Sequence, residues 1–181
     1  FEAIDPVLGI TNRSSGKMGY ALAQAAAEAG ADVTLVSGPT ALPAPSGVTR
    51  IDVTSAAEMA AAVNANLVSA DVFVGVAAVA DYAPAHVSPQ KIKKSGAAMK
   101  LELAPTVDIL ASVAARRKPP FCVGFAAETQ DVEKLAEIKR RKKKLPLIVA
   151  NRVQDAVAAD DNEVVLLDDR GAHPLPRMGK L

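Results

Sequence analysis

Residues 11–19 read Thr-Asn-Arg-Ser-Ser-Gly-Lys-Met-Gly and lie between an extended run and a run of strong helix formers that ends at Ala29. At the start of a helix, the backbone N–H groups of the first turn have no partner within the helix and attract anions. Gly16 lets a phosphate approach the backbone, and the hydroxyls of Ser14 and Ser15 add donors. The spacing supports equally an anion-binding turn and an ordinary serine cap on the helix.

The familiar nucleotide-binding loops do not match this turn. A Walker A loop has Gly at the position of Thr11 and Ser or Thr at the position of Met18. Of the three glycines in a dinucleotide-binding turn, only Gly16 and Gly19 are present. The acid expected at the end of the second strand is replaced by Ser37-Gly38-Pro39. Binding of NAD is therefore disfavoured, and the turn alone does not identify its anion.

Strand-like and helix-forming runs alternate on both sides of the turn. The patterns predict strands at residues 7–11, 33–37, 48–53, 71–80, 100–103, 121–125 and 147–150, and a hairpin at 163–175. They predict helices at residues 17–29, 55–68, 106–116 and 131–144. Such alternation is typical of the α/β class, here a three-layer α/β/α, Rossmann-like, mostly parallel sheet with a C-terminal β-hairpin. Ligands of such sheets bind in turns at the carboxyl ends of strands.

The composition is that of a globular protein, and we expect a single domain over residues 1–181. A net charge of +1 and 3% aromatic residues argue against a nucleic-acid-binding surface. No apolar run reaches membrane-spanning length, so no membrane partner is expected. The lone cysteine, Cys122, is expected to be a buried small hydrophobe, and the lack of a possible internal disulfide favours the cytoplasm.

Two candidate segments follow one another after residue 70. Small residues from Gly75 to Ala80 allow a ligand to lie against the backbone, and Asp81 offers a carboxylate to a cation or a polar ligand. A packed core strand with an exposed terminal acid explains the same pattern, and spacing alone favours that explanation. The loop 81–96 contains Lys91-Ile92-Lys93-Lys94, which suits a polyphosphate because a mobile lysine loop can close over it. A solvated loop is the commoner explanation.

Two more segments lie farther along the chain. Phe125 ends a predicted strand and is able to face a base, although a core Phe is the favoured explanation. Lys139 and Lys143 are four residues apart on one helix face, where they are able to meet a triphosphate together. Their helix starts acidic and ends basic, which complements the helix dipole and accounts for much of the basic run. A nucleic-acid patch is the alternative and is disfavoured by the near-neutral net charge.

Taken together in this order, the motifs resemble phosphopantothenate–cysteine ligase, the synthetase half of the bacterial bifunctional coenzyme A biosynthesis protein. The resemblance covers nearly the whole chain. It rests on seven segments in register: Asp5-Pro6-Val7, Asn12-x-Ser14-Ser15-Gly16-Lys17-Met18-Gly19, Val36-Ser37-Gly38-Pro39, Ala77-Ala78-Val79-Ala80-Asp81-Tyr82, Lys91-Ile92-Lys93-Lys94, Gly124-Phe125-Ala126-Ala127-Glu128-Thr129 and Ala150-Asn151.

The resemblance implies a CTP-dependent ligation of L-cysteine to 4'-phosphopantothenate in two steps. The substrate carboxylate attacks the α-phosphate of CTP, which releases pyrophosphate and leaves an acyl-cytidylate. The cysteine amine then attacks the acyl carbon, and CMP leaves. Such chemistry depends on positioning and charge neutralisation and needs no nucleophilic side chain, which agrees with a sequence that shows no catalytic triad.

The resemblance also implies roles for individual residues. Asn12 would hold the acyl-cytidylate, and Lys91 would neutralise the triphosphate; both are the expected catalytic residues. The other expected substrate contacts are Ser14, Ser15, Gly16, Lys17, Ala77, Ala78 and Asp81. The other expected nucleotide contacts are Gly75, Val76, Ala77, Asp81, Val107, Asp108, Ile109, Leu110, Phe125, Lys139 and Lys143. Asp81 is in addition the expected ligand of Mg²⁺.

The resemblance implies a homodimer with its sites near the subunit interface, and a flavin-dependent decarboxylase half fused to the synthetase in the full-length protein. That half and the first part of the synthetase, including a strand and a Gly/Thr turn, are expected to lie outside this sequence. The family usually has Arg at the position of Leu8. A catalytically impaired nucleotide-binding module of the same fold is therefore the main alternative, and a polyanion-binding interaction protein is the second.

Overall fold

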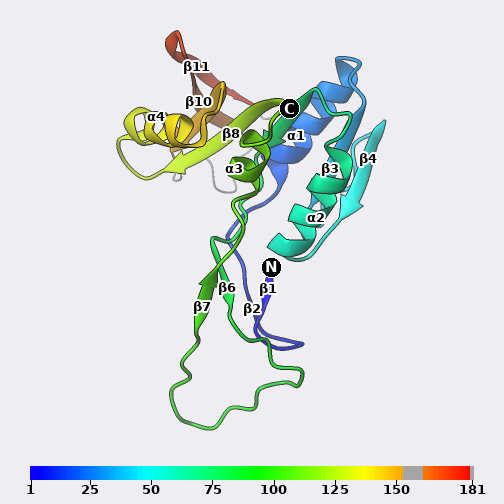
Figure 1. Ribbon diagram of the computed structural model, residues 1–181, viewed down its shortest axis with the longest axis vertical. Coiled ribbons are helices and arrows are strands. Elements are labelled where there is room, and N and C mark those ends of the chain that lie inside the picture. The colour runs from blue at the N-terminus through cyan, green and yellow to red at the C-terminus, as the bar shows by residue number, and fades with distance from the viewer. Residues whose placement is uncertain (153–160, 180–181) are drawn as a thin grey trace.

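The computed structural model describes residues 1–152 and 161–179, and its centre is a five-stranded sheet in the order β11-β10-β9-β8-β5 (Figure 1). Three strands are parallel, and the last two form an antiparallel hairpin at one edge. This arrangement confirms the predicted α/β class with a mostly parallel sheet and a C-terminal hairpin. The strands are β5 (Val72–Gly75), β8 (Phe121–Glu128), β9 (Leu147–Arg152), β10 (Asp161–Asp168) and β11 (Gly171–Gly179).

A second parallel pair consists of β3 (Val33–Ser37) and β4 (Val48–Asp52). Helix α1 packs on β3 and β4, α2 packs on β3, and α4 packs on β8, β9 and β10. The short helix α3 lies between β8 and α4. The helices are α1 (Lys17–Glu28), α2 (Ala56–Asn66), α3 (Ile109–Ala114) and α4 (Val132–Lys143).

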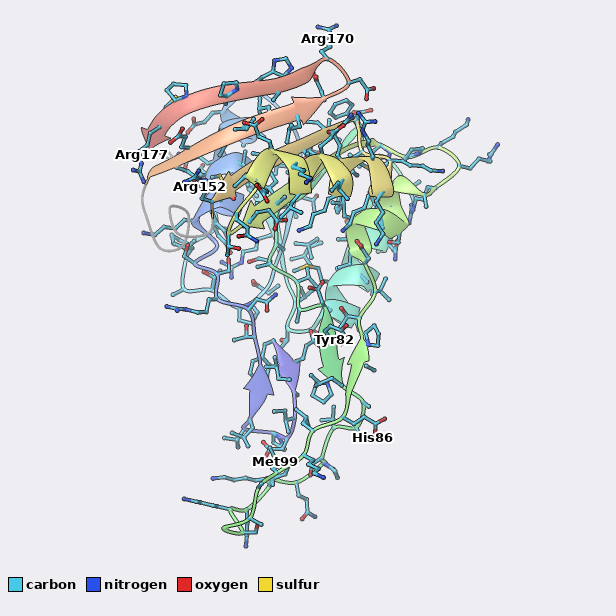
Figure 2. All side chains as sticks on the ribbon, turned by 90° about the vertical axis from the view of Figure 1, so that its left-hand side faces the viewer. Tyr82, His86, Met99, Arg152, Arg170 and Arg177 are labelled. Atoms are coloured by element: carbon cyan, nitrogen blue, oxygen red, sulfur yellow. The ribbon has the colours of Figure 1, made fainter. Side chains whose placement is uncertain are left out.

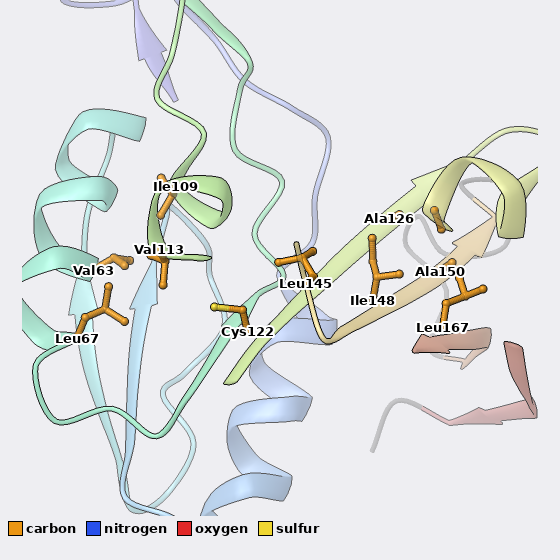
Figure 3. Packing of buried hydrophobic residues seen from close by; sticks show 11 residues of the cluster. Val63, Leu67, Ile109, Val113, Cys122, Ala126, Leu145, Ile148, Ala150 and Leu167 are labelled. Atoms are coloured by element: carbon orange, nitrogen blue, oxygen red, sulfur yellow. The ribbon is translucent and has the colours of Figure 1, made fainter. Parts of the chain in front are cut away.

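One continuous hydrophobic core joins the five-stranded sheet to α2, which packs on β3 (Figure 3). It runs from Val63 on α2, through Val113 on α3, to Ile148 on β9 and Leu167 on β10. Cys122 lies inside it, 1% exposed, and burial raises the pKa of its thiol. The thiol is therefore a packed apolar group, as predicted, and not a reactive one.

A long arm projects away from this body (Figures 1 and 2). It contains two short antiparallel pairs and the loop that joins β6 to β7, and Figure 2 labels His86 and Met99 near its far end. The N–H of Ser88 donates to the carbonyl of Ile4 over 2.8 Å, so the loop is attached to the first hairpin. The strands are β1 (Glu2–Ala3), β2 (Gly9–Ile10), β6 (Tyr82–Pro84) and β7 (Leu103–Pro105).

Two predicted strands were wrong in extent or in partner. The run at 7–11 forms only β2, which pairs antiparallel with β1 in the arm. The run at 71–80 is a strand only up to Gly75, because the chain then turns and the N–H of Val79 donates to the carbonyl of Ala77. Apolar composition alone did not separate the strand from this turn.

Two boundaries in the next segment were also wrong. The strand predicted at 100–103 lies instead at β7, where it pairs with β6. The helix predicted at 106–116 is shorter, because Thr106 is held to the carbonyl oxygens of Ala80 and Asp81 by its hydroxyl and its N–H. Helix α3 then begins after Asp108, whose carboxylate accepts from the N–H of Ala111.

Candidate functional site

The turn before α1 is built around Gly16. Gly16 is the N-cap residue with φ +75°, a left-handed conformation that suits glycine, and no side chain caps the helix. The hydroxyls of Ser14 and Ser15 accept long bonds from backbone N–H groups two residues on, at 3.3 and 3.4 Å. Neither serine is therefore the N-cap residue, and apart from the long bond from Lys17 N to Ser15 no side chain caps the start of the helix.

Hydrogen bonds to neighbouring segments hold this turn in place. The amide Nδ2 of Asn12 donates to the carbonyl of Val79 over 3.0 Å. One turn into α1, the hydroxyl of Tyr20 lies 2.9 Å from that of Ser37 at the end of β3, and both side chains are buried. The turn before α1, the end of β3 and the turn after β5 therefore form one connected surface.

A cavity of about 400 Å³ opens over this surface, and we call it the turn cavity. Its walls are residues 11–20, 35–40, 54–56 and 76–80, with further side chains from the sheet. All the predicted substrate contacts but one line it: Asn12, Ser14, Ser15, Gly16, Lys17, Ala77 and Ala78. The exception is Asp81, which lines the neighbouring cavity.

The neighbouring cavity, the strand cavity, measures about 500 Å³ and lies between β3 and β5. In the described part of the chain these two strands are not paired with each other. Most predicted nucleotide contacts line this cavity: Gly75, Val76, Ala77, Asp81, Val107, Asp108, Ile109, Leu110, Phe125 and Lys143. Small residues shape it, since a Cβ on Gly75 would lie 3.3 Å from Leu110.

The two cavities share a wall. Residues 76–80, Gly19 and Phe125 line both of them. A Cβ on Gly19 would lie 3.3 Å from Val76, so the helix approaches the shared wall closely. Two ligands, one in each cavity, would therefore both contact residues 76–80 and approach each other along this shared lining.

Charged groups lie at the edge of the strand cavity. The Nζ of Lys143 is 2.8 and 3.0 Å from the carboxylate oxygens of Asp108. Partial burial opposes ionisation of Asp108, but the bonds from Lys143 and from the Ala111 N–H outweigh it and lower the pKa of this carboxyl. Lys139, on the same helix, pairs with Glu128 at the end of β8 and lines neither cavity.

Lys91 also lines neither cavity. It lies in the arm, beside a carboxylate that orders the loop: Asp5 accepts from the N–H groups of Val7 and Leu8 at 2.6 Å and from that of Ile92 at 2.8 Å. These bonds, the one from Leu8 first, lower the pKa of Asp5. Within one chain, the arm therefore does not bring Lys91 to the residues with which it was predicted to act.

Two asparagines of the turn cavity carry no predicted role. Asn151 is the second-last residue of β9, and Asn162 is the second residue of β10. Only Asn151 lay in a quoted motif, and no pattern singled out Asn162, because one polar residue before a strand is common. The pairing of β10 with β9 brings both to one end of the sheet.

Asp81 was predicted to be a ligand of Mg²⁺. Among the described residues, no group of three or more His, Cys, Asp or Glu side chains could hold a metal ion. Mg²⁺ is commonly bound by one or two carboxylates together with substrate phosphates. An exposed carboxylate in the wall of the strand cavity fits that pattern, whereas a site made of protein ligands alone does not.

No helix in the described part of the chain has the length and apolar character needed to cross a membrane.

Comparison with known proteins agrees on one family. A family model described as the DNA/pantothenate metabolism flavoprotein C-terminal domain matches residues 1–181. The chain is 53% identical over 185 residues to the coenzyme A biosynthesis bifunctional protein CoaBC of Vibrio cholerae, covering 99% of this chain and 46% of that protein. The chain is 49% identical over 182 residues to CoaBC of Escherichia coli, covering 97% of this chain and 45% of that protein. The chain thus spans about half the length of these curated relatives.

A solved structure agrees in fold. The crystal structure of the C-terminal domain of CoaBC superposes with a TM-score of 0.83 at 42% sequence identity, covering 99% of this chain and 82% of that one.

Proposed function

This chain belongs to the family of DNA/pantothenate metabolism flavoprotein C-terminal domains, and from that membership we propose that it is a phosphopantothenate–cysteine ligase domain. It joins L-cysteine to 4'-phosphopantothenate with CTP as co-substrate and releases CMP and pyrophosphate. In the full-length protein the domain is fused to a flavin-dependent decarboxylase. The relatives, each named a bifunctional protein of coenzyme A biosynthesis, support this assignment.

The shared wall between the two cavities is the observation that supports this function best. A ligase of this kind must bring the carboxylate of one substrate to the α-phosphate of another. We assign 4'-phosphopantothenate to the turn cavity and the cytidine nucleotide to the strand cavity. Their reacting groups then meet at residues 76–80, where the small side chains leave room for both.

In the first step, the substrate phosphate binds the N–H groups and hydroxyls at the start of α1, from Ser14 to Lys17. With its phosphate held there, the molecule directs the carboxylate at its other end toward the shared wall. The attack on the α-phosphorus forms one P–O bond as the bond to pyrophosphate breaks. Holding both reactants in one geometry supplies much of the rate acceleration.

In the second step, Asn12 holds the acyl-cytidylate. Its Nδ2 already donates to Val79 O, which aims the amide at the shared wall. The cysteine amine attacks the acyl carbon, the C–N bond forms, and CMP leaves with the electron pair of the C–O bond. The proton lost by the amine goes to solvent or to the leaving phosphate.

Bound Mg²⁺ would supply charge neutralisation on the nucleotide phosphates, with Asp81 as its protein ligand. Lys143 and Lys139 would approach the same phosphates from α4. Each is paired with a carboxylate in the ligand-free chain, Asp108 and Glu128 respectively. A triphosphate would compete with those carboxylates for the two ammonium groups.

A homodimer gives Lys91 access to a nucleotide. The arm exposes large apolar side chains, among them Val7, Val87 and Met99, each more than half exposed. Such a surface is typical of an interface and not of a solvated loop. We propose that the arms of two copies pack together, and that Lys91 of one copy reaches the strand cavity of the other.

The main rival is a module of the same fold that binds nucleotide without catalysis. This alternative arises because Leu8 stands where the family usually has Arg. The backbone N–H of Leu8 donates to Asp5, and its side chain is exposed on the arm. The experiment is CTP-dependent formation of phosphopantothenoylcysteine, followed by mass spectrometry, with ATP in place of CTP as the control. Product with CTP supports the ligase, and nucleotide binding without product supports the rival.

A further inference from the structure

Asn162 is a buried polar side chain with no partner. It is 6% exposed, and neither its Nδ2 nor its Oδ1 forms a hydrogen bond. The other buried polar or charged side chains of the described residues are all bonded. Glu2 accepts from Ala56 N, Asp5 from three N–H groups, Ser37 contacts Tyr20, and Arg140 donates to three groups. In the described part of the chain, the other buried side-chain atom without a hydrogen bond is Oε1 of Glu128, which forms an ion pair with Lys139, so Asn162 stands apart there.

Asn162 lies in the wall of the candidate site. It lines the turn cavity together with Asn12 and Asn151. It also lies at a register shift between β10 and β11, where Asn162 pairs with Met178 but Val164 pairs with Leu175. A bulge of this kind turns a side chain away from its regular direction and is frequent beside binding sites.

An unpaired buried amide reduces stability unless a ligand completes its bonds. Removing a polar group from water without a partner is unfavourable, and an apolar residue of similar size would avoid that loss. A structural explanation therefore does not account for an amide at this position. A bound molecule with a matching donor and acceptor does.

The chemistry of the amide narrows the ligand. Nδ2 donates and Oδ1 accepts, so the partner must offer an acceptor and a donor close together. A phosphate at neutral pH offers mainly acceptors and would leave Oδ1 facing another oxygen. The pantothenoyl chain has a hydroxyl on the carbon next to its amide carbonyl, and this α-hydroxy amide offers one donor and one acceptor on adjacent carbons.

We propose that Asn162 binds the α-hydroxy amide of 4'-phosphopantothenate, with Oδ1 accepting from the hydroxyl and Nδ2 donating to the carbonyl. This inference rests on the proposed function. It adds a specificity-determining residue between the phosphate site at the start of α1 and the reacting carboxylate. Asn162 selects the pantothenoyl chain over acids of similar length that lack the hydroxyl.

The test pairs a residue change with a ligand change. Binding of 4'-phosphopantothenate and of its analogue with hydrogen in place of the hydroxyl is measured by calorimetry on the wild type and on Asn162→Leu. The wild type should lose about tenfold in affinity for the analogue. Asn162→Leu should bind the natural substrate about tenfold more weakly or worse and should not distinguish the two ligands. Asn66→Leu, on the exposed face of α2, is the control and should behave as the wild type.

Stability gives the second readout. Because the amide has no partner, the Tm of ligand-free Asn162→Leu should equal or exceed that of the wild type. If Asn162→Leu does not fold, Asn162→Ala takes its place in every measurement. A lower Tm with equal loss for both ligands, or an unchanged preference for the hydroxyl, overturns the inference. Binding without discrimination by the wild type overturns this inference alone, whereas no binding of 4'-phosphopantothenate overturns the proposed function as well.

Discussion

At the scale of single residues, Asn12 connects the turn before α1 with the turn after β5 through its bond to Val79 O. Asn12→Asp keeps the shape but replaces the Nδ2 donor with an anionic oxygen beside a phosphate. We expect acyl-cytidylate formation to persist while transfer to cysteine slows by about 10²-fold or more. Rapid-quench measurement of the two steps separates them, and a wild-type transfer rate would remove Asn12 from this role.

Lys91 supplies a second test at the residue scale. Lys91→Gln removes the charge that would oppose the triphosphate, and turnover should fall by about 10- to 100-fold. Lys100→Gln, on the same arm segment, is the matched control and should change kcat little. Equal kinetics for Lys91→Gln and the wild type would exclude Lys91 from the site.

The residue scale is where sequence reasoning was most uneven. Small residues after β5 and the turn before α1 carried enough pattern to place Asn12, Ser14 and Ala77 in one cavity. Asn162 carried none, because its significance depends on burial and on a bulge, and both are properties of the folded sheet. A lone polar residue has no spacing that a sequence can display.

At the scale of elements, α4 is fastened to the C-terminal hairpin by one buried side chain. Arg140, 5% exposed, donates to Glu137, to the carbonyl of Leu145 and to Asp169 in the turn between β10 and β11. This bond set holds the helix that carries Lys139 and Lys143 against the sheet.

Arg140→Met should therefore destabilise the protein by about 2–4 kcal/mol, since it leaves Leu145 O without this donor and removes the buried guanidinium that joins Glu137 to Asp169. Arg141→Met is the control, because Arg141 is exposed and also pairs with Glu137; its effect should stay within about 0.5 kcal/mol. Urea unfolding of the three proteins measures both. Equal effects of the two substitutions would show that burial of Arg140 does not matter.

The same ion pairs make stability depend on pH. Hydrogen bonds from Arg140, then from Arg141, lower the pKa of Glu137 from 4.5 to about 2. The unfolded chain binds this proton at a higher pH than the folded one, so the stabilisation is complete above pH 4.5 and is lost as the pH falls toward 2. In urea unfolding, the difference between wild type and Glu137→Gln should shrink over that range. A difference that is constant from pH 6 to 2.5 would contradict this linkage.

The elements themselves were predicted well where periodicity was strong and poorly where tertiary bonds decided. Helices α1 and α4 end within a few residues of their predicted bounds. The start of α3 was missed because Thr106 bonds to the carbonyls of Ala80 and Asp81, a contact across 25 or more residues that no local pattern reveals.

At the scale of the whole molecule, the arm was not predicted. The sequence favoured a loop over 81–96, but the pairing of β6 with β7 and of β1 with β2 converts it into a projection from the body (Figure 1). The paired runs are too short to be recognised, and Val7 to Ile10 looked like part of the main sheet. The parallel sheet, in contrast, followed from the alternation of strands and helices.

A dimer that shares its sites predicts complementation. Asn12→Asp and Lys91→Gln are each impaired, but a mixed dimer contains one site with both natural residues if Lys91 acts on the other copy. Random mixing should restore about a quarter of the wild-type transfer rate per site. No recovery, with exchange of copies verified by mass, would place Lys91 and Asn12 in the same chain's site. The pair Val87→Glu and Met99→Glu should give monomers, whereas Val68→Glu, exposed outside the arm, should not.

If the two cavities bring a carboxylate and a CTP α-phosphate together, the protein should release pyrophosphate in the absence of cysteine. With CTP and 4'-phosphopantothenate alone, we expect a burst of about one pyrophosphate per site, and cysteine should then convert the burst into continuous turnover. If protein that binds both ligands releases no pyrophosphate with or without cysteine, the two cavities do not bring the reacting groups together.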